Sequence, residues 1–131
     1  MIGRKSFILN LIGGLSPFLT IGQNRKRKNL IVHHTLFWLT NPGSIEDKNE
    51  LIRNLRTLEK IEYHRTLIGI PLTDAKFEST DSSYDVSIVT YFDDSNGRIV
   101  YENHPTHKKF VEQCSSLWDK KISYDTVCEI R

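Results

Sequence analysis

The stretch LIVHHTLFWL, from Leu30 to Leu39, decides the fold. Its dense apolar, β-branched and aromatic residues predict a buried strand. Because side chains alternate between the two faces of a strand, His33 and His34 point in opposite directions. Only one of them can share a pocket with helices that pack on the sheet, and we expect it to be His33. The same alternation places Phe37 on the face of His33.

The segments that follow predict one helix and two further strands. The turn TNPGS ends the first strand, and Ser44 offers an N-cap to a helix over about residues 45–62, in which leucine and isoleucine recur at helical spacing. YHRTLIGI predicts a second strand, which Pro71 ends. Residues 73–83 lack periodicity and indicate a loop, and YDVSIVTYF (84–92) predicts a third strand.

The last part of the chain predicts an interrupted helix and a final strand. Asp94 can cap a helix that begins near Ser95. Pro105 restarts this helix, because proline suits the first helical position, and His104 then lies at the N-cap of the segment HPTHKKFVEQC. KISYDTVC (121–128) predicts the final strand.

The order β-α-β-β-α-β predicts an α+β, ferredoxin-like fold: an antiparallel four-stranded sheet with helices on one face. The other face stays partly bare, and a bare apolar face in so small a protein usually binds a partner. We therefore expect a homodimer in which two sheets pack face to face as a dimeric α/β barrel.

The charge is unevenly distributed. Residues 1–29 hold six of the 18 basic side chains and no acid, so residues 30–131 carry 12 basic against 16 acidic side chains, a net charge of −4. A domain of that sign has no electrostatic reason to bind phosphate backbones, which argues against nucleic-acid binding. The chain divides into a leader with a basic linker (1–29) and one domain (30–131).

The leader has the pattern of an export signal. Arg4 and Lys5 precede an apolar run over residues 7–21 that is too short and too interrupted to span a bilayer. RKSFIL resembles a twin-arginine signal, with Lys5 in place of the second arginine, and predicts export to the periplasm. Two alternatives stay open: a helix that packs on the domain of a cytoplasmic protein, and membrane association through NRKRK.

The cysteines do not predict a metal site. Cys114 and Cys128 lack CxxC spacing, and we expect small buried side chains, although their pairing stays open. The histidines offer no i, i+4 pair, so the sequence predicts no metal and no cofactor.

Several stretches taken in order resemble the stress-responsive α/β-barrel (Dabb) family across residues 30–127. They are VHHTLFWL, LIGIP, SSYDVSIVTYF, YENHPTHKKFV and LWDKKISYD. The resemblance implies a ferredoxin-like fold that dimerises into a barrel. A plant member of the family catalyses an aldol-type cyclisation without metal or cofactor, and its pocket is lined by the first-strand histidine, the second histidine of H-P-x-H and tyrosines. By motif position these are His33, His107 and Tyr101 here.

Two hypotheses about function follow. In the first, the protein binds a small apolar or phenolic molecule in a stress-protective role, and the histidines only shape the pocket. In the second, it is a cofactor-free enzyme: His107 acts as general base, and His33 and Tyr101 donate hydrogen bonds to a developing oxyanion. The further candidates for substrate binding are Tyr84, Gly69, Phe37, Phe110, Trp118 and His104.

Some of these residues also have structural interpretations. His104 is expected mainly to cap the helix, and Trp118 to anchor the core or the dimer. Gly69 is expected to permit a special backbone angle or a close approach to a ligand. The tyrosines of Tyr84-Asp85 and Tyr124-Asp125 are expected in the core, with the aspartates paired to Lys or Arg at the sheet edge.

Overall fold

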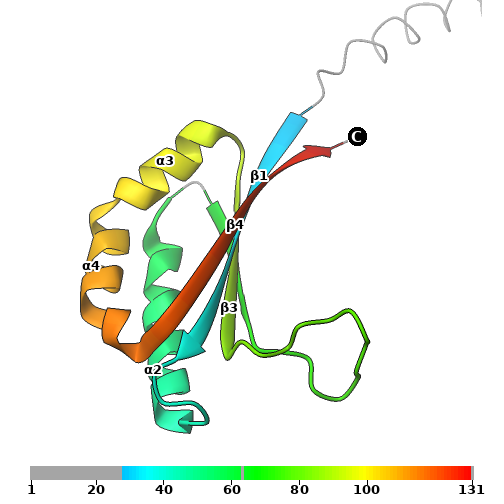
Figure 1. Cartoon of the computed structure of the whole chain (residues 1–131). Coiled ribbons are helices and arrows are strands. Elements are labelled where there is room, and N and C mark those ends of the chain that lie inside the picture. The colour runs from blue at the N-terminus through cyan, green and yellow to red at the C-terminus, as the bar shows by residue number, and fades with distance from the viewer. Residues whose placement is uncertain (1–27, 63, 131) are drawn as a thin grey trace, which may run out of the picture.

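The computed structural model describes residues 28–62 and 64–130. They form a single four-stranded sheet with helices on one face (Figure 1). In chain order the elements are β1 (Lys28–Leu39), α2 (Ile45–Leu55), the 3-10 helix η1 (Arg56–Lys60), β2 (His64–Gly69), β3 (Val86–Phe92), α3 (Ser95–Asn103), α4 (Pro105–Cys114), the 3-10 helix η2 (Ser115–Leu117) and β4 (Trp118–Ile130). The predicted ferredoxin-like α+β fold is confirmed.

The sheet order is β2-β3-β1-β4, and every neighbouring pair is antiparallel. β1 is therefore central, between β3 and the long edge strand β4. His33 is the register partner of Thr90 on one side and of Asp125 on the other. Because register partners point to the same face, these three side chains form a polar row across the sheet under the helices.

The alternation predicted for β1 is confirmed. From Ile31 to Leu39 every second residue is buried, and the residues between them are only half-buried. The buried set faces the helices and comprises Ile31, His33, Thr35, Phe37 and Leu39. His34 points to the opposite face, which we call the outer face.

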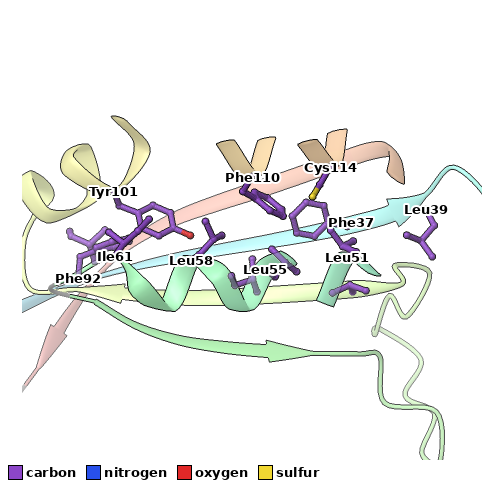
Figure 2. Packing of buried hydrophobic residues seen from close by; sticks show 13 residues of the cluster. Phe37, Leu39, Leu51, Leu55, Leu58, Ile61, Phe92, Tyr101, Phe110 and Cys114 are labelled. Carbon is purple, nitrogen blue, oxygen red and sulfur yellow. The ribbon is translucent and has the colours of Figure 1, made fainter. Parts of the chain in front are cut away.

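The hydrophobic core lies between the sheet and the helices (Figure 2). Leu51 and Leu55 of α2 are fully buried and pack against the sheet, with Phe110 and Cys114 reaching in from α4. Complete burial of a leucine side chain contributes about 1.5–3 kcal/mol, so a few such residues carry much of the stability of a small domain.

Three side chains cap the helices as the sequence predicts. Ser44 Oγ accepts from the backbone N–H of Asp47 at 3.2 Å. Asp94 Oδ1 accepts from the N–H of Gly97 at 2.8 Å, and His104 Nδ1 accepts from the N–H of Thr106 at 3.1 Å. Pro105 occupies the start of α4, where its missing N–H costs nothing.

The helix predicted over residues 45–62 is shorter than expected. Regular α-helix ends at Leu55, and a 3-10 helix continues to Lys60. At this point the Thr57 hydroxyl donates to the carbonyl of Asn54 at 2.6 Å. Such local side-chain bonds compete with the backbone ladder and favour the tighter geometry.

Several further expectations need correction. Gly69 has no left-handed backbone angle; Gly43 in the turn after β1 does, at φ +81°. A Cβ at Gly69 would lie 3.4 Å from Ser87 Oγ, so the close approach there is to the neighbouring strand. Tyr124 is 56% exposed on the outer face rather than in the core. Asp85 pairs with no cation of residues 28–62 and 64–130, but it accepts from the N–H of Leu39 at 2.8 Å.

The remaining features concern the surface. The outer face carries exposed Leu67 as well as Tyr124, and no helix covers it within the described residues (Figure 1).

The loop predicted over residues 73–83 extends over residues 70–85. Cys114 is buried, Cys128 is half-buried, and both are free thiols. None of the helices in the described ranges is long and apolar enough to span a bilayer. The predicted leader lies outside these ranges, except for Lys28 and Asn29, which begin β1.

Candidate functional site

A cavity of about 60 Å³ lies between the inner face of the sheet and the helices. Its polar lining comprises His33, Thr35, Arg98, Tyr101, Glu102, His107, Lys121 and Ser123. Its apolar lining comprises Phe37, Leu55, Leu58, Ile88, Phe110 and Val111. The lining residues that are exposed belong to α3 and β4, so the cavity opens to solvent between these two elements.

The three predicted catalytic residues lie around this one cavity. Tyr101 stands between the two histidines: its ring centre is 6.4 Å from that of His33 and 4.9 Å from that of His107. The alternation of β1 supplies His33, while the helix break at Pro105 lets α3 and α4 present Tyr101 and His107 to the same space. Their catalytic role stays a prediction.

Both ring nitrogens of His33 are engaged. Burial lowers the pKa of His33, the Arg98 charge lowers it further, and the opposing effect of Asp125 does not restore it. The ring is therefore neutral near pH 7 and has one N–H. Asp125 can only accept, because hydrogen bonds from Arg98 and His33 outweigh the effect of burial and lower its pKa. It follows that His33 Nδ1–H donates to Asp125 Oδ1, at 2.8 Å.

This assignment fixes the direction of the neighbouring hydrogen bonds. His33 Nε2 must accept, so Thr35 Oγ1 donates to it at 3.1 Å. With its proton committed, Thr35 must accept from Ser123 Oγ, at 2.8 Å. The result is a directed chain from Ser123 through Thr35 and His33 to Asp125. The chain holds the His33 ring in one tautomer and leaves it no free nitrogen for a bound molecule.

A cluster of charges lies at one end of the cavity mouth, between α3 and β4. Arg98 on α3 donates from Nε to Asp125 Oδ1 at 3.0 Å and from Nη1 to Glu102 Oε2 at 2.6 Å. Asp125 lies on β4, so Arg98 ties the helix to the edge strand across the mouth. Burial opposes ionisation of Glu102, but the hydrogen bond from Arg98 outweighs it and lowers its pKa. Both carboxylates are thus charged near pH 7.

His107 differs from His33 because its ring is unbound. Burial lowers its pKa, with Lys121 and Arg98 acting in the same direction and Glu102 opposing. No hydrogen bond to this ring forms within residues 28–62 and 64–130. Beside it, burial raises the pKa of Tyr101 to about 12, so the phenol keeps its proton. The cavity therefore presents a neutral imidazole and a protonated hydroxyl side by side, a base and a donor.

The other predicted binding residues divide into two groups. Phe37 and Phe110 line the cavity. Trp118 lies behind them, 5.0 Å from the Phe37 ring and 5.8 Å from the Phe110 ring between centres, and so supports the wall. His104, Tyr84 and Gly69 are not part of the lining. His104 is held away from it because its ring caps α4.

The sequence alone did not identify the residues that complete the site. The sequence analysis makes no prediction for Arg98, Glu102 or Lys121. It places Thr35 and Ser123 only on predicted strands. It predicts that Asp125 forms an ion pair at the sheet edge. Alternation along β4 carries a signal for part of this set, because 121, 123 and 125 share the face of His33. The pairing of β4 with β1, which is required to use that signal, is not readable from spacing.

His64 also lies against the site without having been predicted there. Its ring centre is 5.2 Å from that of Tyr101, on the side away from the cavity lining. Two buried polar atoms in this region, His64 Nε2 and Thr66 Oγ1, have no hydrogen-bond partner among the described residues. Thr90, the register partner of Thr66, has its hydroxyl beside the Tyr101 phenol, and a hydrogen bond between the two partly opposes the rise in the Tyr101 pKa.

No group of three or more His, Cys, Asp or Glu side chains within the described ranges has the arrangement of a metal site. Five polar residues of the cavity lining are hydrogen-bonded to polar side chains: His33, Thr35, Ser123, Arg98 and Glu102. Chemistry in this space therefore depends on what His107 and Tyr101 can do with a bound molecule.

Comparison with known proteins agrees with this architecture. No curated protein matches the chain. Among solved structures, a Dabb family protein with a ferredoxin-like fold from Mesorhizobium loti is 18% identical, with a TM-score of 0.64, over 77% of this chain and 98% of that chain. A dimeric ferredoxin-like protein of unknown function from Thermobifida fusca is also 18% identical, with a TM-score of 0.61, over 77% and 92% of the two chains.

An enzyme is among the similar structures. Hydroxynitrile lyase from Passiflora edulis is 12% identical, with a TM-score of 0.64, over 76% of this chain and 93% of that chain. At these identities the likeness shows the fold alone. The model of the stress responsive A/B barrel domain, Dabb, matches residues 31–128, which is most of the chain. This protein therefore belongs to the Dabb family.

Proposed function

We propose that this protein is a homodimer that binds a small carbonyl-containing or phenolic molecule at the cavity of each subunit, with the oxygen of the molecule inside and any larger part at the open mouth. The observation that carries the proposal is the contrast between the two histidines. His33 is bonded at both ring nitrogens and shapes the wall, whereas the ring of His107 is neutral and unbound beside Tyr101. A neutral imidazole can donate and accept, which suits a carbonyl or a phenol.

The experiment is a titration with phenol and with acetone, followed by NMR of the histidine ring protons. Binding in the cavity is expected to shift the His107 signals, with smaller shifts at His33 and none at His34. His107→Ala should abolish the saturable shifts at His33. His104→Asn is the matched control, because asparagine can also cap α4 and residue 104 lies outside the lining. Equal effects of the two substitutions would contradict the proposal.

The homodimer is supported by the bare outer face and by the relatives that are described as dimeric. We expect Val32→Glu, at the centre of the outer face, to halve the mass of the full chain measured by light scattering. Ile99→Glu is the control, since Ile99 is exposed on α3 at the helical side. A wild-type chain that is monomeric at all concentrations would refute this part of the proposal.

A second candidate function is acid–base catalysis without a cofactor. It is favoured by the pairing of a neutral base with a phenol that stays protonated, and a related structure is described as a hydroxynitrile lyase. In this mechanism His107 removes a proton from the bound molecule and the Tyr101 hydroxyl donates to the oxygen that becomes negative. His107→Ala should then abolish turnover at unchanged melting temperature. A loss of stability without any loss of turnover would rule it out.

The leader supports a proposal about location. Export to the periplasm is supported by the basic pair Arg4-Lys5 before an apolar run. Fractionation of cells that express the full chain should find the protein in the periplasm, and Lys5→Gln together with Arg4→Gln should retain it in the cytoplasm. Unchanged fractionation of this double variant would contradict export by that signal.

A further inference from the structure

The charges on the wall of the cavity are separated into two ends. At one end Arg98 is hydrogen-bonded to two carboxylates, Glu102 and Asp125. Two of its N–H donors are committed there, and this cluster carries one more negative than positive charge. An anionic molecule is therefore repelled from this end, although it contains an arginine.

Lys121 supplies a positive charge at the other end. It lies on β4, two residues before Ser123, and lines the same cavity. Within the part of the chain that the structure describes, no carboxylate forms an ion pair with Lys121. Its charge nevertheless reaches the site, because it contributes to the lowered pKa of His107. Lys121 thus stands at the rim without a carboxylate partner in the described ranges, and its Nζ lies 5.9 Å from the centre of the Trp118 ring.

The groups between the two ends are neutral. His107 lines the same cavity as Glu102 and Lys121, and Tyr101 is in contact with its ring. Neither residue supplies charge to balance an anion, but both can donate to an oxygen that is one or two bonds from the anionic group. The cavity therefore has a cation at the rim and hydrogen-bond donors further in.

The size of the cavity limits what enters. A cavity of about 150 Å³ holds benzene, so a space of about 60 Å³ takes about two or three non-hydrogen atoms. A larger molecule must leave part of itself at the open rim, where Lys121 lies.

We propose that the cavity selects short keto acids, with the carboxylate at Lys121 and the keto oxygen between Tyr101 and His107. This inference rests on the proposed binding function and adds a ligand class and a specificity-determining residue. The acyl end fills the small inner space, and the charged end stays partly hydrated at the rim. The ion pair between the ligand carboxylate and Lys121 is exposed, so it adds little binding free energy. Its main effect is to favour anionic ligands over neutral ones.

The test compares pyruvate with pyruvamide, which has the same shape without the charge, in NMR titrations of the full-length protein. Wild type is expected to bind pyruvate more tightly, and Lys121→Gln to weaken pyruvate binding about two- to fivefold with no change for pyruvamide. The matched control is Lys120→Gln. The Lys120 Nζ lies 4.3 Å from the ring centre of Trp38 on the outer face. Lys120→Gln therefore removes one positive charge on the face of the sheet opposite the cavity.

The outcomes separate the two proposals. If Lys121→Gln and Lys120→Gln weaken pyruvate equally, or neither does, the keto-acid inference is overturned. Binding of pyruvamide that still shifts His107 then leaves the proposed function standing. If neither probe binds wild type, the keto-acid inference is overturned and the carbonyl part of the proposed function fails with it. Both lysines are exposed, and equal melting temperatures of the two variants would show that folding is unaffected.

Discussion

Thr35→Val is the sharpest test of the hydrogen-bond chain through His33. Valine has the shape of threonine, so the change removes one hydroxyl and little volume. Thr35 is 4% exposed, and its hydroxyl donates to His33 Nε2 and accepts from Ser123. Ser123 is exposed and can bind water instead, whereas the buried His33 Nε2 loses its donor. A buried acceptor without a partner costs about 1–3 kcal/mol.

Thr66→Val is the matched control. Thr66 lies on β2 on the same face of the sheet as Thr35, and its buried hydroxyl has no hydrogen-bond partner among the described residues. Removing an unpaired buried hydroxyl relieves a desolvation cost, so we expect a change between zero and about 1 kcal/mol of stabilisation. The same substitution should thus have opposite effects at two positions on one face of the sheet.

The assay is urea unfolding at one fixed protomer concentration, because dimer stability depends on concentration. With a slope near 1.5 kcal/mol per molar urea, we expect the midpoint of Thr35→Val to fall by about 0.7–2 M, while that of Thr66→Val stays or rises. Nitrogen shifts of the His33 ring should show the Nδ1–H tautomer in wild type. Equal losses of stability in both variants, or the opposite tautomer, would refute the directed chain.

Three further predictions concern stability. The pKa values of His33 and His107 are lowered in the folded protein, so below the ordinary value of 6.5 the unfolded chain binds more protons than the folded one. The free energy of unfolding should therefore decrease from pH 7 to pH 5, and His107→Gln should make this decrease smaller. Leu51→Ala should cost about 2–5 kcal/mol in chemical unfolding, since Leu51 is fully buried, whereas Ile45→Ala at an exposed site should cost less than about 0.5 kcal/mol. His104→Ala should cost about 0.5–2 kcal/mol through loss of the α4 cap, and His104→Asn should restore most of it in thermal unfolding.

Local patterns were sufficient to predict most of the fold. The alternation of β1 placed the two histidines on opposite faces, and Ser44, Asp94 and Pro105 marked where helices begin. These signals work because each depends on neighbours in sequence. The end of α2 was missed because a threonine hydroxyl, rather than a glycine or proline, changes the helix there.

The site could be predicted only in part. His33, Tyr101 and His107 carry motif positions that can be read along the chain. The roles of Arg98 and Asp125 depend on the pairing of β4 with β1 and on how α3 packs across the edge strand. Such contacts join residues far apart in sequence, and a charged residue on an edge strand has the same local pattern whether it faces solvent or a buried imidazole.

The cavity mouth and the outer face lie on opposite sides of a single sheet. A molecule can therefore enter or leave between α3 and β4 while the outer face remains covered by a second copy. Exchange rates should not depend on protein concentration, and the two subunits of a dimer should fill without influencing each other. The hydrogen bond from Arg98 to Asp125 crosses this mouth, so we expect its opening, a local event within one chain, to limit exchange.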